Sequence, residues 1–324
     1  MLNNEASNIY IIFVLVKEKI AFIVRGNLKK PDAFRANITK YFQEEFDVYL
    51  RFTRRGGHAI KIVDDLLEKD HVDYIVGVGG DGTFSEVVNG YMKAPKEIRE
   101  KVILTTFPRG AGNDFVRTAG IIKSMEHLYD VIKTGKTQKL DLVQVRYLEN
   151  NSKVIRYFDN SFDIGLGGLV CQFVNKSGKT WGSNFTYFYN IIRSFLTFKR
   201  IPVEVEADTF NFKGNVLLVA INNGKYFGSG LCIAPEAEID DGVADVLIAR
   251  KVNIFQFIMQ VGHIRKGKKI DLSEVFYHKL SKATIRSTKV DCPMELDGEV
   301  VGNVPLEIEV IKHAATILKV EEEV

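Results

Sequence analysis

The sequence has few of the residues that build disulfide frameworks or metal clusters. It contains only three cysteines, Cys171, Cys232 and Cys292, and their wide spacing matches neither a zinc site nor a set of disulfides. Its six histidines include no pair four residues apart, so no pair has the spacing of metal ligands on one helix. These shortages favour a protein of the reducing cytoplasm over a disulfide-rich secreted one.

Long apolar runs are also missing. The apolar octet at residues 9–16 is too short to span a bilayer, which needs about 20 such residues. No basic region precedes this octet and no small-residue cleavage site follows it, which argues against a signal peptide. We expect residues 1–18 to form an N-terminal extension, either an extra strand or an over-extended start.

Charge and size are ordinary for a globular protein. A net charge of +3 does not by itself indicate a nucleic-acid partner, although it is compatible with approach to an anionic membrane surface. A length of 324 residues exceeds the usual size of one domain, so we expect two.

The first third of the chain alternates between strand and helix patterns. This alternation predicts an α/β domain at residues 19–137, with a parallel sheet covered by helices on both faces. The expected strands are residues 20–24, 48–52, 74–78 and 102–107, and the expected helices begin near residues 31, 59 and 84.

Short strands dominate after residue 135, with turn residues between them. They predict a mostly antiparallel β-sandwich domain at residues 138–311, joined by a hinge near residues 134–140. One helical insertion is expected at about residues 182–200, and residues 312–324 are expected to pack back on the first domain. The expected strands are residues 140–147, 154–162, 203–205, 216–221, 244–249, 283–287 and 306–310.

Residues 79–83, Gly-Gly-Asp-Gly-Thr, are the most informative stretch. They follow a buried strand and lead into an amphipathic helix. A glycine-rich turn in this position lets the backbone approach a phosphate, and the helix start directs free N–H groups at it. Because the Asp81 carboxylate would repel a phosphate, a cation between the two is the natural inference.

Other interpretations of glycine-rich segments fit less well. Residues 77–82 match the dinucleotide fingerprint, but the next strand ends in Pro108-Arg109, where an acidic residue is required. The glycine loop of protein kinases is not followed by His-Arg-Asp or Asp-Phe-Gly motifs. The Gly-Lys-Thr triplets at 135–137 and 178–180 lack the first glycine of a P-loop. A tight turn with no ligand remains the plain alternative.

Several further motifs follow in order along the chain. Together with residues 79–83 they resemble the diacylglycerol kinase catalytic family, specifically its soluble bacterial lipid kinases, from about residue 19 to residue 320. The motifs are Pro-Arg-Gly-Ala-Gly-Asn-Asp-Phe at 108–115, Asn-Gly-Lys-Tyr-Phe-Gly-Ser-Gly at 223–230, Ala-Pro-Glu-Ala at 234–237, Asp-Asp-Gly-Val-Ala-Asp-Val at 240–246 and Leu-Asp-Gly-Glu at 296–299.

The resemblance implies an ATP-dependent kinase that acts on a lipid hydroxyl, with its active site between the two domains. Asp81 and Asp114 would organise a catalytic Mg²⁺, and Glu299 would be the general base. In the β domain, Asp241 would hold a second, structural Mg²⁺ with the carbonyls of Glu238 and Val243. The residues implied to contact the nucleotide are Thr53, Gly79, Gly80, Asp81, Gly82, Thr83, Phe84, Ser85, Gly110 and Asn113.

The chemistry of these residue types agrees with that assignment. Phosphoryl transfer needs charge neutralisation and alignment more than covalent participation. Asp81 and Asp114 follow neighbouring strands of one sheet, so they can share a hard cation, while Glu299 comes from the other domain. Taken alone, the Asp-Gly pair at 297–298 and the Asp240-Asp241-Gly242 segment also fit plain hairpin turns.

The chain departs from the family pattern at two places. The first strand is followed by Arg25-Gly26-Asn27, where the family usually has Asn-Pro-x-Ser/Ala-Gly. Ala111 replaces the threonine of the family's Gly-Thr-x-Asn-Asp motif, and one lost hydrogen bond costs roughly 1 kcal/mol of nucleotide binding. These changes leave open a low activity, a different nucleotide preference or a catalytically weakened binding protein.

The expected reaction is phosphorylation of diacylglycerol to phosphatidic acid, and other lipid alcohols fit the same motifs. An NAD kinase is the alternative enzyme, since it shares the glycine loop. The aromatic and basic segment 181–200 suits a membrane interface or a helix buried on the β domain, and the basic run 265–269 suits anionic head groups or solvent. We therefore expect a cytoplasmic enzyme with peripheral membrane contact, with a homodimer also compatible.

Overall fold

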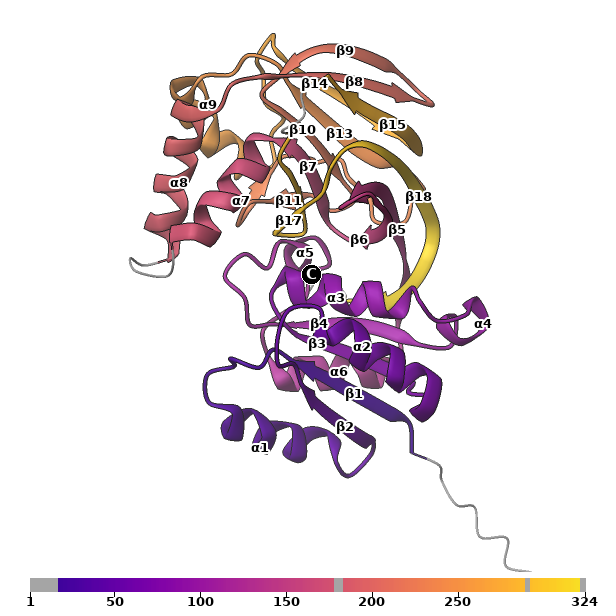
Figure 1. The fold of residues 1–324 in the computed structure, drawn as a ribbon. Helices are drawn as coiled ribbons and strands as arrows, with labels where there is room; N and C mark the ends of the chain where they lie inside the picture. Colours follow the sequence, from indigo (N-terminus) through magenta and orange to yellow (C-terminus); the bar gives the residue numbers. More distant parts are fainter. Residues whose placement is uncertain (1–16, 178–182, 289–291, 321–324) are drawn as a thin grey trace, which may run out of the picture.

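The computed structural model describes residues 17–177, 183–288 and 292–320. Figure 1 shows two lobes, an α/β lobe below and a β-rich lobe above, with the ends of several loops meeting between them. The fold class expected from the sequence is confirmed, with a mostly parallel sheet in the first lobe and an antiparallel β-sandwich in the second. The octet at residues 9–16 lies outside the described residues.

The α/β lobe is built on four parallel strands, in the order β2-β1-β3-β4. Alternate residues of these strands face opposite sides, so each face is apolar and needs a helical cover. Helices α1 and α6 pack on one face, and α2 and α3 pack on the other. The strands are β1 (Lys19–Val24), β2 (Asp47–Phe52), β3 (Tyr74–Gly79) and β4 (Ile103–Pro108).

Helices of this lobe run antiparallel to the strands they connect, and a single π-helical turn, Leu66–Asp70, continues α2. Proline at the first position of α1 suits a helix start because that N–H needs no partner. The helices are α1 (Pro31–Phe42), α2 (His58–Asp65), α3 (Asp81–Tyr91), α4 (Lys96–Arg99), α5 (Asp114–Thr118) and α6 (Met125–Thr134).

The β-rich lobe consists of two sheets that enclose one apolar core, to which side chains of both sheets contribute. One sheet contains β5 (Thr137–Glu149), β6 (Ser152–Phe158), β8 (Ile201–Ala207), β9 (Asn211–Val216), β15 (Lys282–Ser287) and β18 (Asn303–Leu318). The other contains β7 (Ser161–Gly165), β10 (Leu218–Asn222), β13 (Ala244–Ala249), β14 (Val275–Leu280), β16 (Met294–Leu296) and β17 (Glu299–Val301).

Two long strands join the lobes. Strand β5 leaves the α/β lobe, and β18 returns to it while pairing antiparallel with β5. Strand β18 pairs with β15 at Leu306–Ile285 and then runs parallel to β4 at Thr316–Ile103. One ten-stranded sheet therefore continues through both lobes, and the residues expected to form a hinge lie in α6 and the start of β5.

Three helices lie on the outside of the sandwich, namely α7 (Leu166–Ser177), α8 (Ser183–Thr197) and α9 (Ile254–Ile264). Helix α8 agrees with the insertion expected at about residues 182–200, but the expectation of a single helix in this lobe is wrong. The expected strand 154–162 is also wrong, because β6 and β7 are separate strands. A two-stranded ribbon of β11 (Tyr226–Phe227) and β12 (Leu231–Cys232) lies near the lobe boundary.

None of the helices within the described ranges has the length and apolarity to cross a bilayer.

Candidate active site

The loops that follow β3 and β4 pack together backbone against backbone. A Cβ atom added to Gly110 would lie 2.4 Å from the Cα of Gly80, and a Cβ on Gly79 would lie 2.2 Å from Thr83 Oγ1. Neither contact leaves room for a side chain, so glycine is required here by packing. The first turn of α3, at Asp81 and Gly82, follows these glycines at the carboxyl edge of the sheet.

Asn113 fixes the shape of the second loop. Its Oδ1 accepts a hydrogen bond from the Gly110 N–H at 3.1 Å, and its Nδ2 donates to the Gly110 carbonyl at 3.0 Å. Of the other predicted nucleotide contacts, Phe84 and Ser85 are both buried, and Phe84 stacks on Phe115 with ring centroids 5.0 Å apart. These two side chains therefore anchor α3, and the backbone and Thr83 remain to meet a phosphate.

Thr53 lies at the carboxyl end of the neighbouring strand β2. Its Oγ1 accepts a hydrogen bond from the Gly26 N–H at 3.1 Å, so the altered loop after β1 is tied to it. Glu86 of α3 accepts hydrogen bonds from the N–H groups of Gly57 and Ala59, both at 2.9 Å, and so holds the loop that follows Thr53. This role of Glu86, which α3 places one turn after the glycine loop, was not predicted from the sequence.

A groove of about 850 Å³ runs from Gly26 and Thr53 along the edge of β2 and the side of α2. Cationic side chains outnumber acidic ones in its lining, where Asp65 pairs with Lys69 and Asp70 lies nearby, and this excess suits an anionic ligand. The cationic residues that line it are Arg35, Arg51, Arg54 and Lys69, with His58 beside them.

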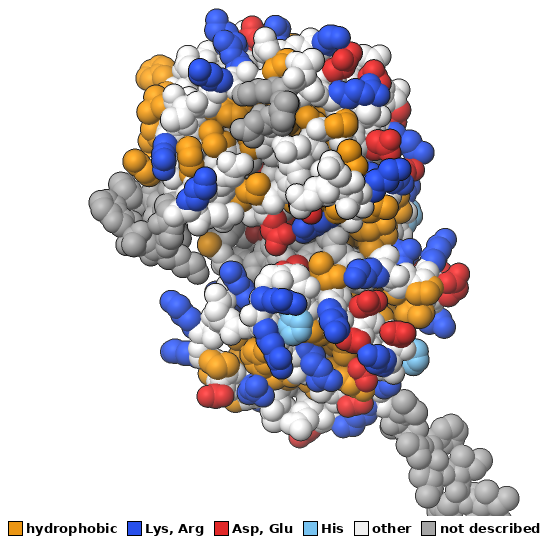
Figure 2. All heavy atoms as spheres, viewed as in Figure 1, with side chains coloured by type: hydrophobic (Ala, Val, Ile, Leu, Met, Phe, Trp, Pro, Cys, Tyr) orange, Lys and Arg blue, Asp and Glu red, His pale blue; other side chains and the backbone are white. Residues whose placement is uncertain are grey.

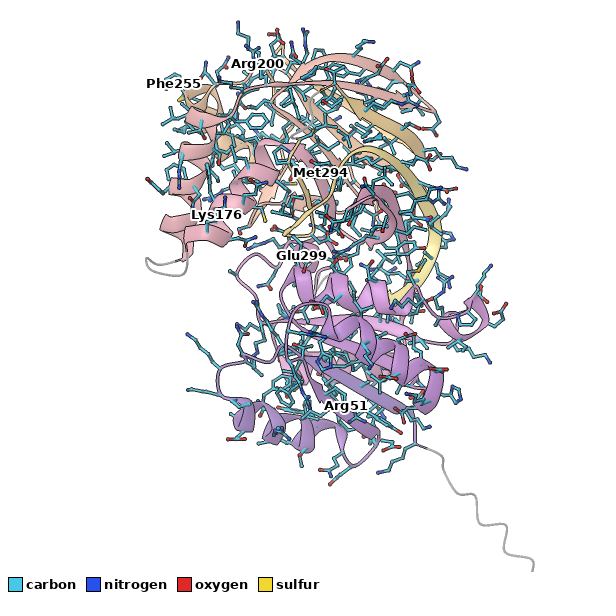
Figure 3. All side chains as sticks on the ribbon, viewed as in Figure 1. Arg51, Lys176, Arg200, Phe255, Met294 and Glu299 are labelled. Carbon is cyan, nitrogen blue, oxygen red and sulfur yellow. The ribbon has the colours of Figure 1, made fainter. Side chains whose placement is uncertain are left out.

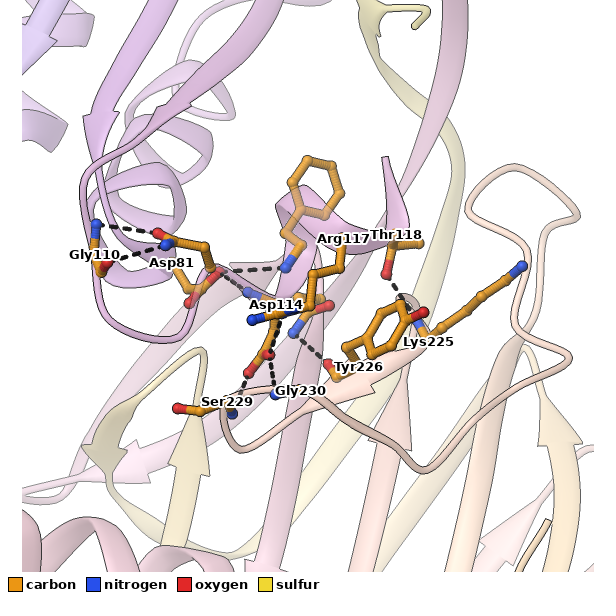
Figure 4. A network of polar contacts seen from close by, with 12 residues as sticks. Asp81, Gly110, Asp114, Arg117, Thr118, Lys225, Tyr226, Ser229 and Gly230 are labelled. Carbon is orange, nitrogen blue, oxygen red and sulfur yellow. Dashed lines mark hydrogen bonds and ion pairs between the residues drawn. The ribbon is translucent and has the colours of Figure 1, made fainter. Parts of the chain in front are cut away.

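Asp81 and Asp114 form a chain of contacts that crosses from one lobe to the other (Figure 4). Asp81 Oδ1 accepts hydrogen bonds from the N–H groups of Asp114 at 2.8 Å and Phe115 at 3.3 Å, which caps the start of α5. The Asp114 carboxylate in turn accepts from the N–H groups of Ser229 at 2.8 Å and Gly230 at 2.7 Å. The Asp81 carboxylate thus orients Asp114, and the Asp114 carboxylate binds the backbone of the β-rich lobe.

The surroundings of Asp81 and Asp114 disfavour two negative charges. Burial raises the pKa of Asp81, and burial together with repulsion from Asp81 raises the pKa of Asp114 to about 6. Hydrogen bonds from the backbone and the Arg117 guanidinium, 3.8 Å from Asp114 Oδ1, oppose that shift. A divalent cation would relieve the remaining repulsion.

Two carboxylates face the position where such a cation would be bound, but a third protein ligand of the same kind does not join them among the described residues. Asp81 Oδ2 lies 3.0 Å, and Asp114 Oδ2 3.6 Å, from the position that a Cβ atom on Gly112 would take, so oxygens of both carboxylates face one side of the Gly112 backbone. Oxygen ligands of this kind suit Mg²⁺, which uses one or two carboxylates together with substrate phosphates. No group of three or more His, Cys, Asp or Glu suited to a metal ion occurs in the described part of the chain.

The turn between β16 and β17 brings the β-rich lobe onto the glycine loop. Asp297 and Gly298 have φ values of 45° and 89°, as a two-residue type I′ hairpin requires. The Asp297 carbonyl oxygen lies 3.8 Å from where a Cβ on Gly82 would be. The hairpin and the phosphate loop therefore meet, and the plain-turn and active-site interpretations of this motif are compatible.

Glu299 follows this turn and lies between the lobes, where Figure 3 labels it. Its Oε2 accepts a hydrogen bond from Arg156 Nη2 at 2.7 Å, and its side chain is 39% exposed. Figure 2 shows acidic side chains in the hollow between the two lobes. The ion pair with Arg156, which the sequence analysis missed, fixes the direction of a carboxylate that can still be reached from this hollow.

Four further carboxyl groups are buried in the hairpin and below it, and none of them was among the predicted site residues. They are Asp159, Asp163, Glu295 and Asp297. Burial raises the pKa of each, with Asp163 reaching about 6 and Asp297 about 7. The available signal was an acidic residue inside each of the short apolar segments 161–164 and 294–296, where Asp163 and Glu295 alternate with core residues and lie on the sheet face that α7 covers.

The predicted structural metal loop has a different arrangement. Lys279 Nζ donates to Asp241 Oδ2 at 3.1 Å and lies 3.4 Å from Asp245 Oδ2, while Lys312 Nζ donates to the Asp241 carbonyl at 3.1 Å. Two ammonium groups thus already neutralise the loop that Glu238 and Val243 flank. Asp241 is thus already paired with two lysines, and its role as a Mg²⁺ ligand with the carbonyls of Glu238 and Val243 stays a prediction.

Comparisons with known proteins agree with this geometry. The diacylglycerol kinase catalytic domain family matches residues 22–145, and the YegS C-terminal NAD kinase beta sandwich-like domain matches residues 160–319. The chain thus combines a diacylglycerol kinase catalytic domain with a YegS-type C-terminal domain. The first match contains the glycine loop and Asp114, and the second contains the hairpin with Glu299, so the candidate site lies where the two matched domains meet.

Curated relatives are similar along most of their length. The diacylglycerol kinase of Staphylococcus carnosus (strain TM300) is 28% identical over 275 residues, which cover 83% of each chain. The diacylglycerol kinase of Bacillus subtilis (strain 168) is 26% identical over 289 residues, covering 88% of this chain and 90% of the other. A kinase function is therefore supported at the level of the family.

Solved structures share the fold. A diacylglycerol kinase from Bacillus anthracis str. Sterne aligns with a TM-score of 0.66 at 21% identity, covering 93% of this chain and 97% of the other. Yeast NADH kinase complexed with NADH aligns with a TM-score of 0.56 at 9% identity, covering 95% and 85%. The two-lobe architecture is thus common to kinases with very different acceptors, and the acceptor must be argued from the site.

Proposed function

We propose that this protein is an ATP-dependent lipid kinase that transfers the γ-phosphate to a lipid hydroxyl, with diacylglycerol as the acceptor and phosphatidic acid as the product. The observation that carries the proposal is the contact of the Asp297-Gly298 turn with Gly82. Glu299 directly follows this turn, so the contact supports a role for its carboxylate next to the phosphate loop of the other lobe.

Each part of this arrangement has a chemical task. The N–H groups at the start of α3, exposed by the glycines at 79, 80 and 82, bind phosphate oxygens. Asp81, supported by Asp114, would hold Mg²⁺, and that ion would neutralise charge on the phosphates. The groove at Gly26 and Thr53, with its cationic side chains, receives the rest of the nucleotide.

Glu299 acts on the acceptor alcohol. An alcohol proton is hard to remove at neutral pH, so a carboxylate is effective late in the reaction, when charge develops on the attacking oxygen. Arg156 holds the Glu299 carboxylate in position through a hydrogen bond of 2.7 Å. The positive charge of the guanidinium stabilises the negative charge of the carboxylate, as surrounding water would otherwise do.

The outer helices of the β-rich lobe support an acceptor that resides in a membrane. Figure 2 shows apolar side chains gathered along the edge of this lobe where Figure 1 places α8 and α9. The exposed large apolar residues of these two helices are Phe188, Tyr189, Leu196, Phe255, Ile258 and Met259. An apolar patch of this kind marks a binding surface.

The charge around this patch selects an anionic surface. No Asp or Glu occurs between Asp163 and Glu204, or between Asp245 and Asp271, the two stretches that contain α7, α8 and α9. Exposed cations such as Lys199, Arg200 and Lys251 flank the apolar side chains. We infer that a cytoplasmic enzyme binds anionic lipid reversibly through this face.

A transfer assay with γ-labelled ATP tests the assignment. Diacylglycerol in mixed micelles should gain label in the presence of Mg²⁺, and Glu299→Gln should remove that label. NAD offered in place of lipid should stay unlabelled. Label on NAD would instead identify an NAD kinase. If the protein binds ATP but labels neither acceptor, it is the catalytically weakened binding protein.

A further inference from the structure

Two fully enclosed carboxyl groups face each other below the proposed catalytic turn. Strands β7 and β16 pair antiparallel, and their register sets Asp163 directly opposite Glu295. Both side chains are buried, with exposed fractions of 0% and 6%. Two negative charges at adjacent positions of one sheet face, without solvent, would repel each other strongly.

Each carboxyl group has one oxygen with a partner and one without. Glu295 Oε1 accepts a hydrogen bond from the Gly298 N–H, and Asp163 Oδ1 accepts one from the Gly168 N–H at 3.1 Å. The remaining oxygens, Glu295 Oε2 and Asp163 Oδ2, are buried without a donor. Within the described residues neither group has a lysine or arginine partner, so a proton is the only cation that the surroundings supply.

The helix that starts beside Asp163 decides which group keeps its charge. Asp163 lies at the N-terminal end of α7, and a Cβ atom on Gly167 would be 2.3 Å from its carboxyl oxygen. The positive end of a helix stabilises a negative charge there, so Asp163 is the ionised partner. Burial raises the pKa of both groups, and for Glu295 the charge on Asp163 adds to that rise.

Other titratable groups around the pair do not offer an alternative. Cys171 of α7 donates its thiol to the Gly298 carbonyl at 3.1 Å, and burial raises the pKa of that thiol to about 12, so it stays neutral. Asp297, whose pKa is raised to about 7, Glu299 and Asp114 are further carboxyl groups that supply no cation, and Arg156 is already held by Glu299.

We propose that Glu295 is a protonated positioning residue, which donates its carboxylic proton to Asp163 and holds the turn that carries Glu299 through the Gly298 N–H. This inference rests on the proposed role of Glu299. The shared proton links the start of α7 to the turn, so the outer helical layer and the general base are parts of one rigid unit. A shift of the turn by about 1 Å can cost as much as 100-fold in rate.

The pH dependence of stability tests the proton independently of catalysis. For a group whose pKa is raised in the folded protein, stability is complete below its ordinary pKa and is lost as pH rises toward the folded value. Thermal unfolding of the wild type should therefore move to lower temperature as pH rises above about 4.3, the ordinary value for glutamate. Glu295→Gln, which donates an N–H in place of the proton, should reduce that slope, whereas Glu274→Gln should leave it unchanged.

Turnover then tests the positioning role. We expect Glu295→Gln to keep kcat within about twofold of wild type and to extend activity to higher pH, whereas Glu295→Ala should lower kcat by between about 10- and 100-fold. The KM for ATP should be the same in all three proteins. A stability slope unaltered in Glu295→Gln overturns the proposal, as does an unaltered kcat in Glu295→Ala. Absence of lipid phosphorylation in the wild type would instead reject the proposed function and leave the stability test valid.

Discussion

The carbonyl oxygen of Asp297 lies within 3.8 Å of the position that a Cβ atom on Gly82 would occupy. One of these residues belongs to a hairpin of the sandwich and the other to the first turn of α3, so the two lobes meet at the proposed site of phosphoryl transfer. The lobes are also joined at Asp114, whose carboxylate accepts N–H groups of Ser229 and Gly230. Substitutions at this junction should affect nucleotide and acceptor chemistry together.

Replacing Gly110 by alanine should disrupt the nucleotide loop. The new methyl group would lie 2.4 Å from the Cα of Gly80, and backbone cannot move aside as a flexible side chain can. We expect a loss of stability of about 1–3 kcal/mol, typical of overpacking, and a raised KM for ATP. Gly56→Ala is the matched control, because no atom lies within 4 Å of its added Cβ. Equal behaviour of the two variants would contradict the packing argument.

Asp114→Asn should change how stability depends on pH. The pKa of Asp114 in the folded protein is about 6, above the ordinary value near 3.9, so its contribution is complete below about pH 4 and is lost as pH rises toward 6. The wild type should therefore lose on the order of 2 kcal/mol relative to the variant over that interval. Chemical denaturation of both proteins from pH 4 to pH 7 measures the difference, and parallel curves would refute it.

Lys279→Met should make the stability of the β-rich lobe depend on a divalent cation. The wild-type ammonium group lies 3.1 Å from Asp241 and 3.4 Å from Asp245, and its removal leaves two neighbouring carboxylates uncompensated. Because Lys279 is 40% exposed, we expect a loss of only about 1–2 kcal/mol.

Millimolar Mg²⁺ or Ca²⁺ should restore part of the stability that Lys279→Met loses. The same ions should not change the melting temperature of the nucleotide-free wild type by binding at Asp241. Lys282→Met, which breaks an exposed pair with Glu309, serves as the control and should show no rescue. Metal stabilisation of the wild type that is abolished by Asp241→Asn would show that the loop binds a metal after all.

Charges placed in the outer apolar patch should weaken binding to membranes. Leu196 and Met259, which are 74% and 64% exposed, can be replaced by aspartate without disturbing the core. We expect the double variant to float less with anionic vesicles than the wild type does, while its melting temperature is retained. Ile122→Asp changes a residue of the other lobe that is 48% exposed, and it should float as the wild type does. Equal flotation of all three would contradict the assignment of this face.

Local patterns were sufficient to predict the α/β lobe. The alternation of strands 20–24 and 74–78 with amphipathic helices depends on residues that are close in the sequence. The spacing of apolar residues is therefore sufficient to predict it. Helices α7 and α9 were missed because the turn residues and short apolar segments after residue 135 were interpreted as strands, with a single helical insertion. The strand predicted at 154–162 divides at Asp159-Asn160, where the chain passes from one sheet to the other.

The candidate site was predicted only in its outline. Asp81, Asp114 and Glu299 follow from motifs, but the partners that orient them come from distant parts of the chain. Arg156 reaches Glu299 across 143 positions, and Ser229 reaches Asp114 across 115. Pairings of this kind depend on sheet register, which a single sequence does not reveal.

The turnover of Glu299→Gln tests the central claim most directly. The substitution keeps the size of the side chain and a partner for Arg156, but it removes the carboxylate that would take the proton of the lipid hydroxyl. We predict a fall in kcat for diacylglycerol phosphorylation of roughly 100- to 10,000-fold, with ATP affinity measured by calorimetry unchanged. A variant that phosphorylates diacylglycerol at the wild-type rate would show that this carboxylate is not the general base.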